Sequence, residues 1–132
     1  MTVVLDASAA LEIVFNGAKS TIYRQTLEKA DLVLAPVLFD SEVTNVLWKY
    51  IKMGIVDEDN AIKSMLLLFQ LVDDFIPTSE LAVEALHEAT RLNHPVYDMY
   101  YFVLARRNGA VLLTEDKKLQ VLALDNGVRL NS

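Results

Sequence analysis

Residues 3–9 read VVLDASA, and this stretch places a short buried strand directly before a helix. The apolar residues 3–5 are typical of a buried strand, yet the strand ends on the carboxylate of Asp6. Small residues follow Asp6, where a turn would usually place Gly or Pro. Asp is a favoured N-cap residue, so capping of the next helix is the simplest explanation of Asp6 taken alone.

The same alternation of short strands and helices continues along the chain. The expected strands are residues 2–5, 32–35, 75–76, 110–114 and 128–130. The expected helices are residues 7–15, 19–29, 36–53, 57–72, 78–92 and 98–108, with one more before the last strand. Short strands joined by helices form a parallel sheet that helices cover on both faces. The sequence therefore predicts a three-layer α/β/α fold with a short, mostly parallel central sheet, in a single domain over residues 1–132.

Composition narrows the class of protein. The chain has 132 residues, of which 53% are hydrophobic, and this suits a globular domain with a sizeable core. It has no cysteine, which excludes a disulfide scaffold, a thiolate metal site and a thiol nucleophile. No secretory signal is visible, and the longest uncharged apolar run, residues 65–72, is too short to cross a bilayer. We expect a soluble, cytoplasmic protein with no membrane contact.

The formal net charge of −6 taken alone argues against a nucleic-acid-binding protein. Such proteins usually carry a basic face that neutralises phosphates. A cluster of carboxylates that binds metal ions would, however, also make a protein acidic in composition. The net charge therefore does not exclude a metal-dependent enzyme.

Four acids stand out by their positions. Asp6 and Asp116 each follow a predicted strand, while Glu42 and Asp98 lie in apolar helical segments. Glu42 falls within the apolar stripe of Phe39, Val43 and Val46, so its charge is costly unless a cation or hydrogen bonds offset it. Each acid also has an ordinary explanation. The three aspartates lie at helix starts, which favour acids, and Glu42 at the boundary of the stripe would reach water.

The four acids matter as a set, because the carboxyl ends of parallel strands meet at the edge of the sheet where ligands bind. Carboxylates without a paired Arg or Lys repel one another and raise one another's pKa values. A hard divalent cation removes that repulsion, and oxygen ligands suit Mg²⁺ or Mn²⁺. The two histidines, His87 and His94, read as surface residues, so a zinc site is not expected.

Four segments together resemble a known family. They are VVLDASA at 3–9, LFDSEVTNVLWKY at 38–50, HPVYDMYYFVLARRNGAVLLTED at 94–116 and the helix expected before the last strand. In order and spacing they resemble the PIN-domain ribonucleases, and more narrowly the VapC toxins of type II toxin–antitoxin pairs. The resemblance covers residues 3–130 and implies a PIN-like fold with metal-dependent endonucleolytic cleavage of RNA.

The resemblance also implies roles for single residues. Asp6 and Asp98 match the acids expected to bind Mg²⁺ or Mn²⁺, and Glu42 and Asp116 would bind a second ion or act through water. Thr114 would position the attacking water or a phosphate oxygen, as part of a catalytic set with the four acids. Ser8 would orient Asp6.

The expected partners are RNA, a small cognate antitoxin and a second copy of the chain. The antitoxin of such a pair places its tail in the active-site groove. Phosphate contacts are open to Lys49, Lys52, Lys117 and Lys118, and base stacking to Tyr97, Tyr100 and Tyr101 if their rings are exposed. Solvated lysines and core tyrosines are the plainer alternatives. The helix over residues 61–72 is apolar nearly all round at its end, which indicates either a dimer surface or a buried core helix.

Other functions stay open at this point. A PIN-like domain with little or no nuclease activity would act as a binding module. A haloacid-dehalogenase-type phosphatase also has an aspartate after its first strand, but it needs a second acid two residues later, where this chain has Ser8. A receiver-like phosphoacceptor would need a Lys after a late strand, where this chain has Thr114 and Glu115.

Overall fold

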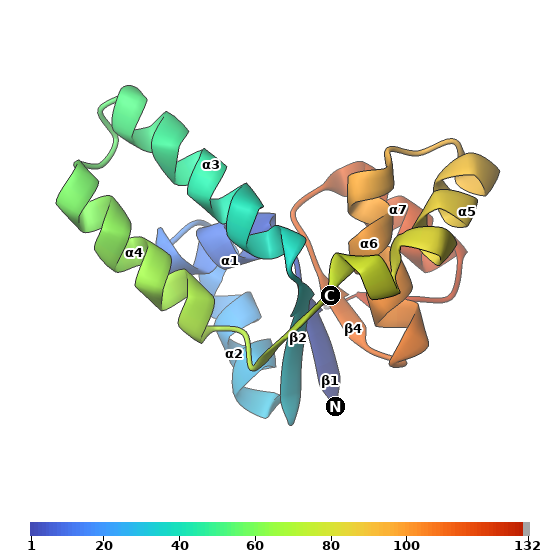
Figure 1. The fold of residues 1–132 in the computed structure, drawn as a ribbon. Helices are drawn as coiled ribbons and strands as arrows, with labels where there is room; N and C mark the ends of the chain where they lie inside the picture. Colours follow the sequence, from blue (N-terminus) through green and yellow to red (C-terminus); the bar gives the residue numbers. More distant parts are fainter. Residues whose placement is uncertain (131–132) are drawn as a thin grey trace.

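The computed structural model describes residues 1–130, and its centre is a sheet of five parallel strands (Figure 1). The strand order is β3-β2-β1-β4-β5. The strands are β1 (Thr2–Leu5), β2 (Leu32–Pro36), β3 (Asp74–Ile76), β4 (Val111–Leu113) and β5 (Arg129–Leu130). Asn131 and Ser132, the last residues of the expected domain, lie outside the described residues.

Seven α-helices cover the two faces of this sheet within the described residues. They are α1 (Ala7–Val14), α2 (Ser20–Lys29), α3 (Leu38–Lys52), α4 (Glu58–Gln70), α5 (Ala82–Leu92), α6 (Val96–Arg107) and α7 (Lys117–Asp125). Figure 1 shows α1 to α4 on one side of the sheet and α5 to α7 on the other, with α3 and α4 reaching outward as an arm. The three-layer α/β/α fold and the parallel sheet are therefore confirmed.

The alternation of side chains along the strands divides the core in two. Val3 and Leu5 of β1 pack into the core under α1 to α4, while Val4 between them packs into the core under α5 to α7. All three residues are completely buried, because each face of the central strand is covered by helices. The carboxyl end of β1 is thus held rigidly between both helical layers.

Several predicted boundaries were wrong by a few residues. Pro36 was expected to open a helix, but it ends β2 and pairs with Ile76 of β3, since the fixed φ of proline also suits a strand end. The sixth helix begins at Val96 rather than at Asp98, so Asp98 lies in the first turn. The segment Thr78–Glu80 is a separate 3₁₀ turn before α5.

The order of the strands creates a switch point at the carboxyl end of β1. The chain passes from β1 to β2 and β3 on one side, then crosses to β4 and β5 on the other side. Ligand sites of open parallel sheets lie where the order reverses in this way. None of the helices in residues 1–130 has the length and apolar character needed to cross a membrane.

Candidate active site

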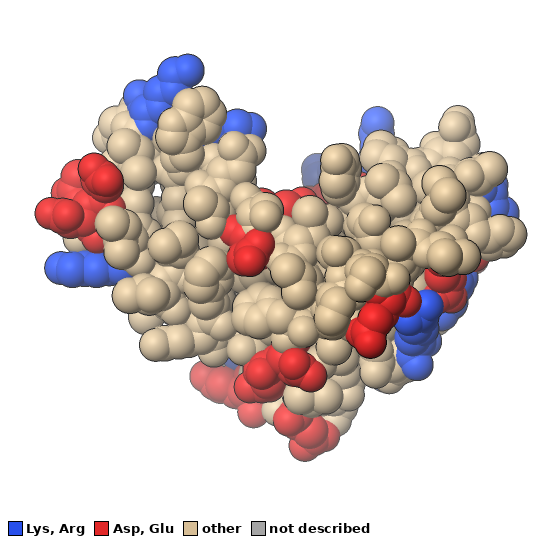
Figure 2. Space-filling model, viewed as in Figure 1, with Lys and Arg blue, Asp and Glu red and all other residues tan. Residues whose placement is uncertain are grey.

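An acidic cleft opens at this switch point, between α3 on one wall and α6 on the other. Its volume is about 440 Å³, and Asp6, Glu42, Asp98 and Asp116 all line it. Figure 2 shows the surface hollowed between the α3–α4 arm and the lobe of α5 to α7, with acidic side chains at the bottom of the hollow. The fold therefore brings together four acids that are up to 110 residues apart in the sequence.

Asp6 occupies the N-cap position of α1, but its side chain makes no capping hydrogen bond. Instead, Asp6 Oδ2 accepts hydrogen bonds from Thr114 Oγ1 at 2.6 Å and from Ser8 Oγ at 3.1 Å. Burial raises the pKa of Asp6 to about 6, although these two hydrogen bonds oppose the rise, and the charge of Asp98 adds to it. The capping explanation thus fails for Asp6, and the expected contact with Ser8 is present.

Glu42 enters the cleft from the first half of α3 and is half-buried. Its Oε1 accepts a hydrogen bond from the hydroxyl of Tyr101 at 2.6 Å. Burial raises the pKa of Glu42 to about 7, with smaller contributions from the charges of Asp6 and Asp98 and an opposing one from Tyr101. Tyr101 was considered for base stacking, which is wrong, because its ring is completely buried under the site.

Asp98 reaches the cleft from the first turn of α6, where it makes no capping bond. Its Oδ2 lies 2.7 Å from Nε2 of His94. The side chain of His94 is only 11% exposed, so the expectation of a surface histidine was wrong. The spacing of four residues between His94 and Asp98 was a usable signal, since such pairs meet at the start of a helix.

Asp116 behaves as an ordinary cap, because its Oδ1 accepts a hydrogen bond from the backbone N–H of Leu119 at the start of α7. It is exposed at the rim of the cleft. The hydroxyl of Thr114 donates to Asp6 and accepts from the backbone N–H of Asp116 at 3.1 Å. Thr114 therefore links these two acids, and its proton is directed to Asp6.

One further acid, Glu12 of α1, also lines the cleft and was missed by the sequence analysis. A hydrogen bond with Glu115 is the main cause that raises the pKa of Glu12. Glu115 itself turns toward α2, where it accepts a hydrogen bond from Tyr23 and pairs with Lys19 at 3.5 Å. Gly17 leaves room for this arrangement, because a Cβ at that position would lie 1.4 Å from Oε1 of Glu12.

No Lys or Arg side chain among residues 1–130 forms an ion pair with Asp6, Glu42, Asp98 or Asp116. Burial raises the pKa values of Asp6 and Glu42, and the charge of Asp98 adds to both rises, so a cation in the cleft would favour their charged forms. An oxygen-only donor set of this kind fits Mg²⁺ or Mn²⁺.

The same acids do not form a complete metal cage. Within the described part of the chain, no three His, Asp or Glu side chains stand close enough together to hold one ion. This agrees with the usual coordination of Mg²⁺ in proteins, which binds one or two carboxylates and keeps several water ligands. The residues therefore fit a hydrated divalent cation.

The candidate RNA contacts surround the cleft without lining it. Lys49 and Lys52 near the end of α3, and Lys117 and Lys118 at the start of α7, are all exposed. Tyr97 is also exposed. Figure 2 shows Lys and Arg side chains at the outer ends of both lobes, on either side of the acidic hollow.

The apolar helix α4 turns out to be a core helix on one side only. Leu68 is completely buried in the core under α1 to α4, whereas Leu66 and Leu67 are 56% and 54% exposed. Trp48 on the neighbouring helix α3 is exposed as well. The arm thus has an uncovered apolar surface.

Comparison with known proteins agrees with the resemblance seen in the sequence. The model of the PIN domain family matches residues 3–124. A protein named Ribonuclease VapC3 from Pyrobaculum aerophilum is 30% identical over 121 residues, which cover 90% of this chain and 92% of the relative. A protein named Ribonuclease VapC1 from Mycobacterium tuberculosis is 30% identical over 116 residues, covering 88% and 86%. A crystal structure of a Pyrobaculum aerophilum protein superimposes with a TM-score of 0.74 at 25% identity, over 98% of this chain and 83% of that one.

Proposed function

The chain belongs to the PIN domain family, and from that premise we propose that it is a Mg²⁺- or Mn²⁺-dependent endoribonuclease that acts as the toxin of a toxin–antitoxin pair. The observation that carries the proposal is the acidic cleft at the switch point. Asp6, Glu42, Asp98 and Asp116 line it together, and none of them pairs with a Lys or Arg of the described chain. The names of the two relatives, both ribonucleases, support RNA as the substrate.

When bound, a divalent cation would supply positive charge that offsets the charge of the scissile phosphate and lowers the pKa of a bound water. Asp6 and Asp98 are the residues that would hold it through their carboxylates. Thr114 and Ser8 keep Asp6 in place by donating to its Oδ2. Asp116 at the rim contributes through water or to a second ion.

Glu42 is suited to move a proton. Burial raises the pKa of Glu42 to about 7 in the metal-free protein, and a carboxyl with a pKa near the working pH accepts and releases protons readily. Tyr101 donates to Oε1, and burial raises the pKa of Tyr101, so that its hydroxyl keeps its proton and only orients Glu42. We assign to Glu42 Oε2 the acceptance of a proton from the attacking water.

A metal-dependent cleavage assay tests this function. Purified protein, freed of any small partner by refolding, is incubated with single-stranded RNAs of varied sequence and with Mg²⁺ or Mn²⁺. We expect internal cleavage that stops with chelator. Asp98→Asn should lower the rate by at least ~100-fold, because an amide replaces a charged ligand.

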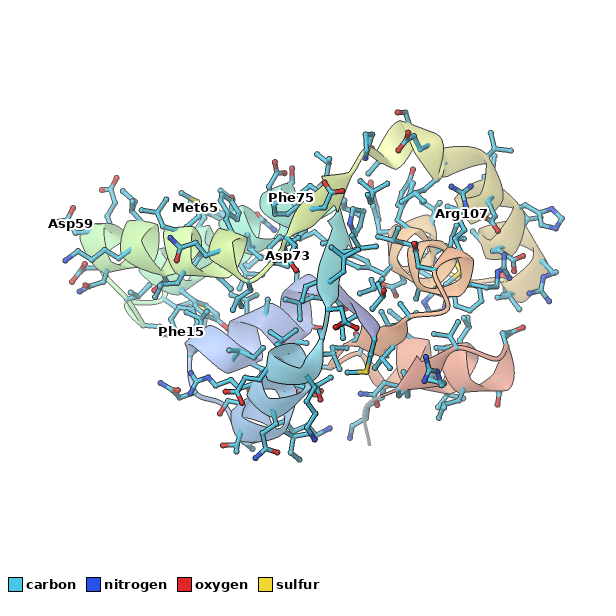
Figure 3. All side chains as sticks on the ribbon, turned by 90° about the horizontal axis from the view of Figure 1, so that it is seen from below. Phe15, Asp59, Met65, Asp73, Phe75 and Arg107 are labelled. Carbon is cyan, nitrogen blue, oxygen red and sulfur yellow. The ribbon has the colours of Figure 1, made fainter. Side chains whose placement is uncertain are left out.

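The matched control is Asp59→Asn, which removes one negative charge from the outer end of α4 (Figure 3). This variant should cleave RNA at the wild-type rate. If the wild-type protein and Asp98→Asn are equally inert on all RNAs, the binding-module alternative replaces the nuclease. Hydrolysis of a phosphomonoester in place of RNA would favour the phosphatase alternative.

The toxin role requires a partner that covers the cleft. We propose a small antitoxin whose tail places a basic side chain against the acids, since the cleft lacks a cation of its own. A short reading frame directly upstream of the gene should encode it. Coexpression of that product should restore growth of cells that produce this chain and should block RNA cleavage by the purified complex.

A further inference from the structure

His94 belongs to the short connection between α5 and α6, outside both helices. Its Nε2 lies 2.7 Å from Oδ2 of Asp98. A carboxylate can only accept a hydrogen bond, so Nε2 is the nitrogen that carries the proton. No other side chain of the described residues contacts the Asp98 carboxylate in a hydrogen bond or ion pair.

The backbone on both sides of His94 has a defined conformation. Asn93 ends α5 in the left-handed conformation with φ 51°, a common way to terminate a helix. The N–H of His94 then donates to the carbonyl of Ala89 at 3.1 Å. Pro95 follows with a rigid φ and forms the N-cap of α6. The backbone of His94 is therefore anchored to the end of α5, and its ring reaches Asp98 in the first turn of α6.

The other two inner acids of the cleft have similar arrangements. One oxygen of Asp6 accepts hydrogen bonds from the hydroxyls of Thr114 and Ser8, and one oxygen of Glu42 accepts a hydrogen bond from the hydroxyl of Tyr101. In each case one donor comes from a distant segment of the chain, Thr114 for Asp6 and Tyr101 for Glu42. Hydrogen-bonded partners of this kind orient metal-binding carboxylates and raise metal affinity.

We propose that His94 is a positioning residue for the metal site, which holds Oδ2 of Asp98 so that Oδ1 faces the cation in the cleft. The inference rests on the proposed function, because it assigns a role toward the cation of that site. A different reading of the same contact is purely structural, with the pair only stabilising the start of α6. The two readings differ in what happens to metal affinity.

The test compares two substitutions of His94 by calorimetric titration with Mn²⁺ alone. His94→Phe keeps a ring of similar size but removes the donor, whereas His94→Gln retains an N–H near the position of Nε2. We expect His94→Phe to weaken Mn²⁺ binding by roughly 10–100-fold and His94→Gln to stay within about 3-fold of wild type. In the background of Asp98→Asn, His94→Phe should cause no further loss, because the residue it positions is already changed.

The second histidine provides the control. His87 is exposed on α5, and His87→Phe should leave Mn²⁺ affinity unchanged. If His94→Phe and His94→Gln lower the Tm alike and both bind Mn²⁺ as wild type does, the contact is structural and the inference is overturned. If wild type itself neither binds Mn²⁺ nor cleaves RNA, the proposed function fails and the inference fails with it. Cleavage and binding by wild type, with no effect of His94→Phe, would overturn the inference alone.

Discussion

At the scale of single residues, Asp6 and Asp116 show how the same residue type at the same kind of position acquires different properties. Both occupy an N-cap after a strand, but only Asp116 accepts the backbone hydrogen bond of a cap. Asp6 is 7% exposed, and its carboxylate accepts hydrogen bonds from the hydroxyls of Thr114 and Ser8 in place of the backbone N–H groups of the helix. Burial of this carboxylate destabilises its charged form, and that destabilisation can be measured.

We predict that Asp6→Asn stabilises the metal-free protein at alkaline pH. The pKa of Asp6 rises from 3.8 to about 6 on folding, so the folded state keeps a proton that the unfolded state loses between these pH values. The contribution of Asp6 to the free energy of unfolding is therefore fully present below about pH 4, and it is lost as the pH rises through about 6. Asn keeps an oxygen acceptor and needs no proton. The variant should gain on the order of 2–3 kcal/mol at pH 8, seen as a Tm about 5–10 °C higher in EDTA.

The comparison with wild type must be made at each pH, because other groups titrate in the opposite sense. Ion pairs with Arg91 and Arg106 hold the pKa of Glu88 below its ordinary value, so every variant loses stability in acid. The difference between Asp6→Asn and wild type removes this common effect. That difference should vanish near pH 4, and an equal Tm at pH 8 would contradict the raised pKa of Asp6. Exposed Asp59→Asn should match wild type at both pH values.

The partners of the acids were much harder to predict than the acids themselves. Asp6, Glu42 and Asp98 were found because a charge beside apolar residues is visible in the sequence. Tyr101 looked like one more core aromatic, and nothing in its position on α6 reveals that it meets Glu42, 59 residues earlier. His94 was missed for a local reason, because the helix was expected to begin at Asp98, whereas it begins at Val96, two residues after His94.

At the scale of helices and strands, hydrophobic patterning predicted which elements exist, and tertiary contacts decided where some of them begin. Each strand of the sheet was expected within about two residues, since buried apolar runs are strong signals. Pro36 was misassigned because proline suits both a helix start and the end of a strand, and only the pairing with Ile76 distinguishes them. The 3₁₀ turn at Thr78–Glu80 likewise has no distinct sequence pattern.

Helices α1 and α3 give the cleft an aromatic wall beside its acids. Phe15, at the end of α1, and Tyr50 of α3 meet edge to face, with ring centroids 5.2 Å apart. Both residues line the cleft and are only half-buried. Figure 3 shows Phe15 between α1 and the α3–α4 arm. Bases of single-stranded RNA stack on aromatic rings, so under the proposed function this wall would receive a base of the substrate.

We predict that Tyr50→Ala raises KM for a single-stranded RNA about 10-fold, because one stacked base contributes roughly 1–3 kcal/mol. Tyr50 touches none of the four acids through a hydrogen bond, so kcat and Mn²⁺ affinity should stay within about 2-fold of wild type. Steady-state kinetics and calorimetry measure these quantities. His87→Ala on α5, an exposed ring that does not line the cleft, is the control and should leave KM unchanged. A fall in kcat at unchanged KM would exclude base stacking.

At the scale of the whole molecule, the site is a product of the strand order. β1 lies between β2 and β4, so Asp6 after β1 meets Thr114 after β4 and Glu42 on the helix after β2. The sequence indicated parallel strands but not their order, because pairing partners leave no local pattern in short buried strands. The family resemblance and the set of acids predicted that these acids lie close together, although the strand order was not predicted.

The α3–α4 arm extends from this compact centre (Figure 1). It exposes several apolar side chains. The most exposed of them are Trp48, Met53, Ile55, Leu66 and Leu67. Exposed apolar side chains gathered on one arm of a small domain are typical of a surface that another protein covers. We propose a second copy of the chain as the partner there, in line with the dimer expected from the sequence.

Leu66→Glu should therefore dissociate the homodimer. A carboxylate placed in an apolar interface loses its hydration without gaining a partner, which costs several kcal/mol and weakens dimerisation by at least ~100-fold. Wild type should sediment as a dimer at micromolar concentration and Leu66→Glu as a folded monomer with an unchanged circular dichroism spectrum. The matched control is Leu86→Glu on α5, where a leucine 64% exposed lies on the opposite lobe. That variant should remain dimeric, and a dimer that survives Leu66→Glu but not Leu86→Glu would move the interface from the arm to α5.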